Sequence, residues 1–590
     1  MLDRTRGLSS TTRGRLLRSA LPAWIALALV VAACAPPQPA RETGSSSAGG
    51  QPTTAPKRIT AVIMGEPPTL SVKINSAGAG GIFPGADAVE ELVSAGLTHL
   101  DHSNVLHPQL AEAVPTVENG LWKVLPDGRM ETTWKLHPNA RWHDGTPVTT
   151  EDLLFTVRLV QDRELATFSH PGFESVGSVD APDARTITVT WKRPYIQANT
   201  MFTSIFPSFA LPLPKHLLEP TYLNDRAAFL DLPFWNQGFV GSGPYRLKEW
   251  VAGSHLMLEA NDAYTLGKPK VDTLEIKFIP DSSTLAANLL AGTVELTLGR
   301  TLSLEQALQV RDQWGDRGAM AIRVTSWVVL YPQFISPNPA VVSNVQFRRA
   351  LLHAIDRQEM VDAILAGIPP VADSYVSPRA PEYPDIQDKI TRYPYDPQRA
   401  MQMIEGLGYT RGTDGTFRDA SGQPLALELR TTGDLDLHRK AILAVTDYWQ
   451  RVGVAVDPVI VPIQRQRDRE YRSQFPAFEL LQQGNDLGSL VVLHGRGTPL
   501  AENNWNGRNK ARYRNPEFDA LIDQFFVTID RKERMQVLGQ IVSHSTDQLN
   551  VMGLFYQAAP TMVGSRLVNI GEYGERATPA WNAHEWNVRS

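Results

Sequence analysis

Hydrophobic and polar residues recur with two different periods along this chain. Alternating or β-branched runs predict strands at 59–64, 186–191, 256–258 and 273–279. The apolar spacing of helices marks residues 151–162, 284–290, 344–366, 397–406, 437–452, 516–526 and 531–547. Two more apolar runs, 425–429 and 455–461, flank the helix predicted at 437–452, as in a βαβ unit with parallel strands. The pattern therefore predicts a mixed α/β protein.

Signals at the expected helix ends support these assignments. Thr149 and Asp152 stand three residues apart before an apolar-periodic segment, which is the spacing of a capping box. Pro397 is suited to the first position of a helix, and Gly408 is suited to a helix end.

The first 33 residues predict an export signal. Five arginines and one aspartate precede an apolar run at 21–33, which is shorter than the ~20 residues that a membrane-spanning helix needs. The run ends in Ala-Ala-Cys, the pattern of a lipoprotein cleavage site, and Cys34 is the only cysteine of the chain. We therefore expect a lipid anchor on Cys34 and, at residues 34–57, a flexible linker rich in Pro, Gly, Ser and Thr.

Composition excludes several functions. Without residues 1–33 the chain has 52 basic and 61 acidic residues, a net charge of −9, which argues against a nucleic-acid partner.

More than 500 residues remain, too many for one core, so we expect at least two domains. The sequence contains neither a G-x-S-x-G nor an H-E-x-x-H motif, and no second cysteine.

The most specific pattern is TWKLHPNARWHDGTPVTTEDLLFTVRLV at 133–160. A strand, an arginine, an aromatic residue, His-Asp-Gly and a capped helix follow one another in this segment. It resembles the signature region of the extracytoplasmic solute-binding proteins of family 5, the peptide, nickel and opine receptors of ABC importers. Further segments that are similar to the family follow in order at 239–250, 259–270, 279–296, 344–367, 395–409 and 513–519.

The resemblance spans roughly residues 58–570 and implies an α/β, two-lobed fold like that of periplasmic binding proteins. It has a hinged ligand cleft and an enlarged first lobe. Lobe I would comprise residues 58–322, lobe II residues 323–552, and residues 553–590 would return to lobe I. A ligand that bridges both lobes favours the closed form. Since no bond is made or broken, we expect no enzyme activity, no catalytic residue and no cofactor.

The resemblance also implies where a peptide ligand would bind. Peptide-binding relatives commonly hold the ligand's amine with an aspartate of lobe II, and Asp486, next to Asn485, falls near that place. The tryptophan and tyrosine that usually flank this aspartate are missing, which puts a peptide ligand in doubt. A surface turn is the alternative for these two residues.

Five other residues are candidate ligand contacts. Trp327 and Tyr331 follow the expected crossover between the lobes and would either stack on a ligand or pack in the core. Trp505 has asparagine neighbours that suit a cleft. Arg496 would pair with an anionic group or be solvated. Glu90 lies near the family's cleft, although it opens an apolar run and is expected to begin a helix.

His99, His102 and His107 lie close in sequence, but their spacing does not place them on one helical face. We therefore expect no metal site.

The leading hypothesis is a monomeric, lipid-anchored receptor on the outer face of the cytoplasmic membrane, periplasmic or extracellular. It would capture an oligopeptide or similar polar solute and deliver it to an ABC permease and its ATPase. An oligosaccharide receptor of the same family, a secreted hydrolase and a purely structural lipoprotein are the alternatives. Stoichiometric binding without turnover would separate the receptors from the other two.

Overall fold

The computed structural model describes residues 56–77, 83–168, 170–203, 210–433, 435–570 and 577–589. The chain from Pro56 to Ser590 forms one compact unit. The predicted signal peptide, Cys34 and nearly all of the predicted linker lie outside the described residues. Within the described ranges, no helix combines the length and the apolar character that crossing a membrane requires.

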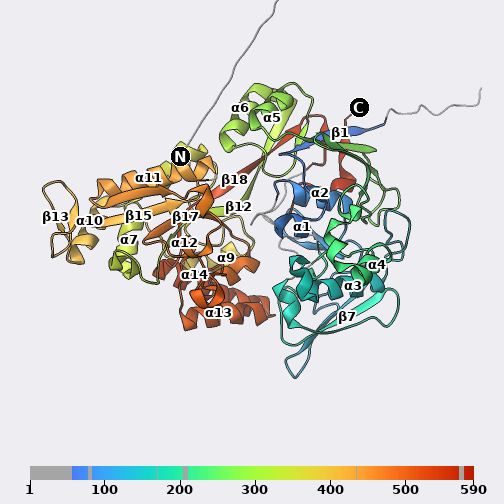
Figure 1. The fold of residues 1–590 in the computed structure, drawn as a ribbon, viewed down its shortest axis with the longest axis horizontal. Helices are drawn as coiled ribbons and strands as arrows, with labels where there is room; N and C mark the ends of the chain where they lie inside the picture. Colours follow the sequence, from blue (N-terminus) through green and yellow to red (C-terminus); the bar gives the residue numbers. More distant parts are fainter. Residues whose placement is uncertain are drawn as a thin grey trace, which may run out of the picture. The chain divides into compact units, whose positions relative to one another are not determined.

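A ten-stranded sheet runs through the described part of this unit (Figure 1). Its strands follow the order β16-β15-β17-β12-β18-β11-β1-β10-β9-β8. Their bounds are β1 Arg58–Ile63, β8 Tyr245–Val251, β9 His255–Ala260, β10 Thr273–Phe278, β11 Leu296–Thr297, β12 Gly318–Pro332, β15 Ala426–Thr431, β16 Ala455–Ile460, β17 Phe478–Gly484 and β18 Met552–Gly564.

The long strands β12 and β18 join the two halves of the sheet. They are antiparallel, with Gly318 opposite Gly564 and Leu330 opposite Met552. β18 also pairs with β11, whereas the second half of β12 pairs with β17. The predicted lobe limits at 322 and 552 fall inside β12 and at the first residue of β18, and we use these limits to name lobes I and II.

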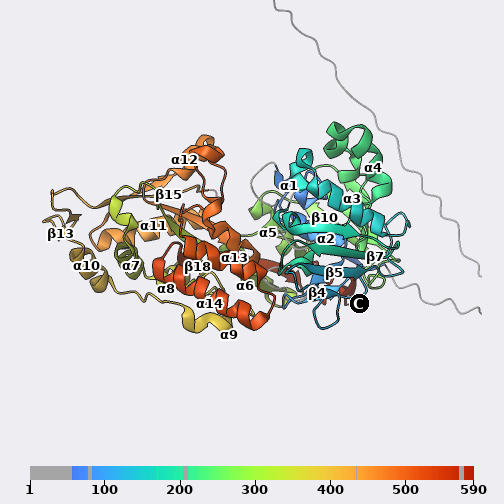
Figure 2. The same cartoon turned by 90° about the horizontal axis from the view of Figure 1, so that it is seen from below.

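Lobe I carries an additional antiparallel sheet of order β4-β5-β7-β6 (Figure 2). Trp134 of β5, Trp191 of β7 and Phe155 of α3 are fully or almost fully buried in one core behind it. Its elements are β4 Trp122–Val124, β5 Met130–Lys135, β6 Val176–Asp180, β7 Thr186–Trp191, α3 Thr150–Gln161 and α4 Lys215–Asn224. This layer accounts for the enlarged first lobe.

Lobe II packs helices on both faces of its part of the sheet. Since successive side chains of a strand point to opposite faces, Val328 and Leu330 of β12 join the core of α7 and α11. Trp327 and Val329 join the core of α13 and α14. The parallel pairing of β15 with β16 around α11 confirms the predicted βαβ unit.

The remaining described elements complete the chain. The helices are α1 Val72–Ala77, α2 Ala86–Val93, α5 Ser282–Leu290, α6 Leu304–Trp314, α7 Val345–His353, α8 Arg357–Leu365, α9 Tyr383–Ile386, α10 Pro397–Gly406, α11 Asp436–Arg451, α12 Arg469–Ser473, α13 Pro516–Val527 and α14 Arg531–Gln548. The short strands are β2 Thr98–Leu100, β3 Leu106–Pro108, β13 Thr410–Arg411, β14 Phe417–Arg418, β19 Leu567–Val568 and β20 Asn587–Val588.

Most predicted elements are confirmed to within two or three residues, and the capping box of Thr149 and Asp152 is present. The helical segment predicted at 344–366 consists of two helices, because the side chain of Asp356 accepts from Glu359 N and caps α8 separately. One prediction is wrong. Glu90 does not begin a helix, since α2 begins at Ala86 and ends at Val93.

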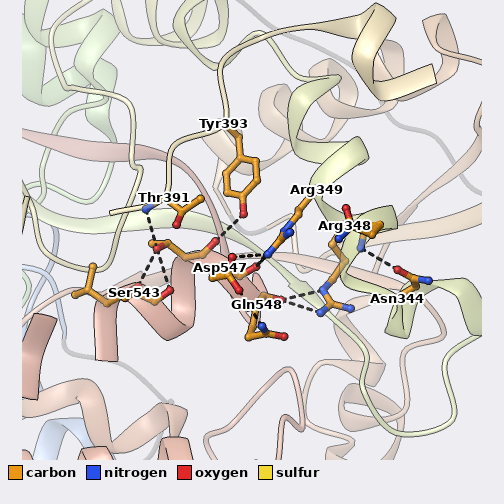
Figure 3. Close-up of polar contacts among 11 residues, drawn as sticks. Asn344, Arg348, Arg349, Thr391, Tyr393, Ser543, Asp547 and Gln548 are labelled. Carbon is orange, nitrogen blue, oxygen red and sulfur yellow. Dashed lines mark hydrogen bonds and ion pairs between the residues drawn. The ribbon is translucent and has the colours of Figure 1, made fainter. Parts of the chain in front are cut away.

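Two arginines of α7 bind the C-terminal end of α14 (Figure 3). The Arg348 guanidinium donates to the carbonyl oxygens of Gln548 at 2.7 Å and Val342 at 2.8 Å, and Arg349 donates to that of Asp547 at 2.9 Å. The last carbonyls of a helix lack partners within the helix, and cations suit this end of its dipole. Leu549, in the left-handed conformation, ends α14, and β18 begins three residues later at Met552, so the two arginines bind the helix end that precedes this strand.

Replacing Arg348 by Met should lower the free energy of unfolding by about 2–4 kcal/mol, because buried carbonyl groups lose charged donors. Chemical denaturation measures this loss. The control is Arg399→Met on the exposed side of α10, expected to change stability by less than about 0.5 kcal/mol. Equal stabilities for the two variants would show that the arginine does not hold the helix end.

Candidate functional site

A cavity of about 350 Å³ lies where segments of both lobes meet. This volume falls within the ~300–1,000 Å³ of small-molecule sites. Its walls are formed by lobe I (Met64, Pro84, Ser282 and residues 300–306), lobe II (Ile364, Leu365, residues 435–437 and Lys440) and β18 (residues 557–560).

The cavity lies at the carboxyl ends of parallel strands. In lobe I, β1 is parallel to β10 and β11, and in lobe II, β15 is parallel to β16 and β17. Met64 directly follows β1, Arg300 comes three residues after β11, and Leu435 follows β15. Ligands of open α/β sheets bind at these strand ends, outside the sheet. The position of the cavity is therefore that of a binding site.

Two glycines bring the backbone before Arg300 against the start of α2. Gly299 has φ 69°, and a Cβ on it would stand 2.3 Å from the nitrogen of Gly85. A Cβ on Gly85, whose φ is 88°, would stand 2.9 Å from the carbonyl oxygen of Leu298. No larger side chain fits at either position, so this close backbone contact fixes Arg300 in the cavity wall.

Three of the four charged residues in the cavity wall form one ion-pair cluster, and the fourth, Arg300, is a cation outside this cluster. Lys440 Nζ of α11 lies 3.0 Å from Glu305 Oε2 of α6 and 3.1 Å from Asp436 Oδ2, and these carboxylates raise the pKa of Lys440. The Glu305–Lys440 pair joins the two lobes. Arg300 forms no hydrogen bond or ion pair within the described part of the chain.

The lobes touch at a second place. The backbone nitrogen of Ile196 in lobe I donates to the carbonyl oxygen of Phe526 in lobe II at 3.0 Å. Gly488 lies so near Gln197 that a Cβ there would stand 2.6 Å from its Nε2 atom. Both contacts belong to a state in which the lobes meet.

Four of the predicted ligand residues lie around Tyr375 in lobe II. The Tyr375 ring meets the buried Trp327 edge to face, and its hydroxyl donates to the backbone carbonyl of Asp486. The Asp486 side chain accepts from Ser489 N at 3.1 Å, which caps the following turn. Tyr331 donates its hydroxyl to Gln483, and Asn485 is buried, with 5% of its surface exposed.

Several polar atoms of this group are buried without a hydrogen-bond partner in the described residues. They are Trp327 Nε1, Gln483 Nε2 and Asn485 Nδ2. Since buried polar groups are normally satisfied, these atoms need a partner, such as a buried water, that the described residues do not supply. A ligand-binding role for Trp327, Tyr331, Asn485 and Asp486 stays a proposal.

The other three predicted residues lie apart from this group. Arg496 pairs with Asp523 of α13 at 3.3 Å, and the Trp505 ring lies under the Arg512 guanidinium at 5.5 Å. Glu90 of α2 accepts from the backbone nitrogen of Val72 at 3.0 Å. None of the seven predicted ligand residues lines the cavity described above.

Comparison with known proteins agrees with this architecture. Residues 105–490 match the model of the bacterial extracellular solute-binding proteins, family 5. The chain belongs to this family.

Relatives and solved structures cover most of the chain. The oligopeptide-binding protein AppA of Bacillus subtilis is 23% identical over 474 residues, which are 79% of this chain and 81% of that protein. The oligopeptide-binding protein of Thermus thermophilus complexed with a pentapeptide has a TM-score of 0.68 at 24% identity, covering 90% of this chain and 96% of that one. NikA of Brucella suis in complex with Fe(III)-EDTA has a TM-score of 0.73 at 19% identity, with 90% and 100% covered. These structures share the two-lobed fold.

In this family 5 protein the sequence did not single out Arg300, Lys440 or Glu305. Only the Ser303–Gln306 capping box at the start of α6 offered a local signal there, and it marks a helix rather than a site. Among the described residues no group of three or more His, Cys, Asp or Glu side chains is placed to hold a metal ion.

Glu90 should make the stability of this solute-binding protein depend on pH. Burial raises the pKa of Glu90 to about 8, from 4.5, so the folded state keeps a proton that the unfolded chain releases between these values. Stability should therefore fall as pH rises from about 5 to 8. The variant Glu90→Gln can still accept the hydrogen bond from Val72 N. The melting temperature of this variant should fall less than that of the wild type as pH rises from about 5 to 8.

The control is Glu502→Gln at an exposed position, which should keep the wild-type pH dependence. A thermal-unfolding series from pH 5 to 8 compares the three proteins. Parallel curves for the wild type and Glu90→Gln would contradict a protonated Glu90.

Proposed function

We propose that this protein is a lipid-anchored substrate-binding protein of an ABC importer that captures an oligopeptide or similar polar solute and delivers it to a permease. The cavity with walls from both lobes carries this proposal. A ligand in such a cavity contacts both lobes only when they meet, so binding shifts the population towards the closed form.

The peptide class is supported by the relatives. The oligopeptide-binding proteins of B. subtilis and T. thermophilus match over most of their length. We expect stoichiometric binding without turnover.

Small molecules released by denaturing the freshly purified protein should include short peptides, detected by mass spectrometry. Adding such a peptide at 100 times its dissociation constant should stabilise the folded state by about 2.7 kcal/mol, which raises the melting temperature. Hydrolysis of the peptide would revive the hydrolase alternative. If neither released peptides nor a thermal shift with peptides is found, the peptide assignment fails.

Cys34 should tether the protein to the membrane. A diacylglycerol on this cysteine, with a second acyl signal, would give stable attachment, and the linker at 34–57 would give the folded unit reach towards a permease in the same membrane. In cells, the wild type should fractionate with membranes, whereas Cys34→Ala should lose the lipid and leave the membrane fraction or keep its signal peptide uncleaved. Equal fractionation of fully processed wild type and variant would contradict a lipid anchor.

A further inference from the structure

The cavity between the lobes contains one charged group that has no ion-pair partner among the described residues. Four charged residues line it, of which Glu305, Asp436 and Lys440 form the ion-pair cluster. Two carboxylates and one ammonium would leave a net charge of −1, and Arg300 brings the sum to zero. Yet the two carboxylates are already engaged by Lys440, whereas Arg300 has no partner among the described residues. The one unmatched charged group of the wall is thus a cation.

Three helices begin at this cavity. Ser282 is the first residue of α5, residues 303–306 form the start of α6, and residues 435–437 form the start of α11. The N-terminal end of a helix carries partial positive charge from its free N–H groups, and anions bind there. Among the described residues no side chain caps α11; the N–H groups of His438 and Arg439 donate to the carbonyl oxygen of Leu435, and those of Asp436 and Leu437 have no described acceptor. The cluster of Glu305, Asp436 and Lys440 carries a net charge of −1, which offsets only part of this potential.

Arg300 is suited to bind a ligand from this position. Its side chain is exposed and lines the cavity, so a solute can reach it. The surrounding protein nevertheless removes enough water to lower the pKa of its guanidinium, and no described residue compensates for that loss. A guanidinium has five N–H donors in a planar arrangement that matches a carboxylate with two parallel hydrogen bonds.

We propose that this cavity binds an anionic group of the solute, a carboxylate, through Arg300 of lobe I and the N-terminal turn of α11 in lobe II. This inference rests on the proposed solute-binding function and specifies its ligand class. The carboxylate joins the two lobes, since one of its partners belongs to each. Its source is either the C-terminus of a peptide or an acidic side chain.

Four matched peptides test the proposal, with the full-length protein in the form that results from processing in the cell. The probes are tetra-alanine with a free C-terminal carboxylate, tetra-alanine amide, Ala-Ala-Ala-Glu amide and Ala-Ala-Ala-Gln amide. Isothermal titration calorimetry gives their dissociation constants. The wild type should bind at least one acid probe about tenfold or more tightly than its neutral counterpart, as expected for a charge-assisted pair. Which acid is preferred identifies the source of the carboxylate.

Three variants separate charge from structure. Arg300→Gln should reduce the preference for the acid peptide over its neutral counterpart to less than about threefold, while neutral peptides bind as to the wild type. Arg300→Lys should give an intermediate preference, because lysine keeps the charge but cannot form the two parallel hydrogen bonds of a guanidinium. The control Arg467→Gln, at an exposed position that contributes nothing to the cavity wall, should behave as the wild type. Melting temperatures establish that all variants are folded.

The possible failures are distinguishable. If the wild type binds acid and neutral peptides equally, or if Arg300→Gln keeps the preference, the carboxylate site is overturned while the solute-binding function stands. If the wild type binds none of the four peptides, the carboxylate site is also overturned for peptides. The molecules released from the purified protein then decide separately whether the solute-binding function holds.

Discussion

The antiparallel pair of β12 and β18 is the constraint on which the rest of the structure depends. Both strands belong to one sheet that continues into each lobe, so the lobes cannot separate without bending these strands. The register shifts between Val324 and Ser326, where a bulge increases local twist. Ser326 lies opposite Gln557 and donates to its side chain at 3.1 Å. Since Gln557 also lines the cavity, the irregular part of the hinge strands directly adjoins the candidate site.

The electrostatics of the cavity follow from the same topology. A helix that follows a parallel strand begins at the strand's carboxyl end, so the positive ends of α6 and α11 face the cavity as a consequence of the fold. Acidic residues in their first turns would cancel this field if they were free. Lys440 pairs with both Glu305 and Asp436 and neutralises one of their two charges, and Arg300 offsets the other, so the helix ends act on a wall whose side-chain charges sum to zero.

Local signals predicted local structure well, and they gave no indication of the residues that form the cavity wall. The capping box at Thr149 and the alternation at 186–191 depend on neighbours in sequence, and both are present as expected. Asp356 shows the limit of such signals: apolar spacing continues across it, but its capping bond divides the segment into two helices. The cavity wall joins Met64, Arg300 and Gln557, which are hundreds of residues apart. Nothing in the neighbourhood of Arg300 in sequence distinguishes it from other arginines, because its missing partner is visible only in three dimensions.

The two polar contacts between the lobes are individually weak. The Glu305–Lys440 pair has side chains 64% and 45% exposed, and such pairs contribute about 0.2–1 kcal/mol. The bond from Ile196 to Phe526 adds about 0.5–1.5 kcal/mol. Moving a two-state equilibrium from 1:99 to 99:1 needs about 5.5 kcal/mol. These two contacts supply at most about half of this, and the packing of Ile196 on the lobe II core and of Ile529 on the lobe I core adds to them. Under the proposed function, a solute that contacts both lobes would stabilise the closed form further.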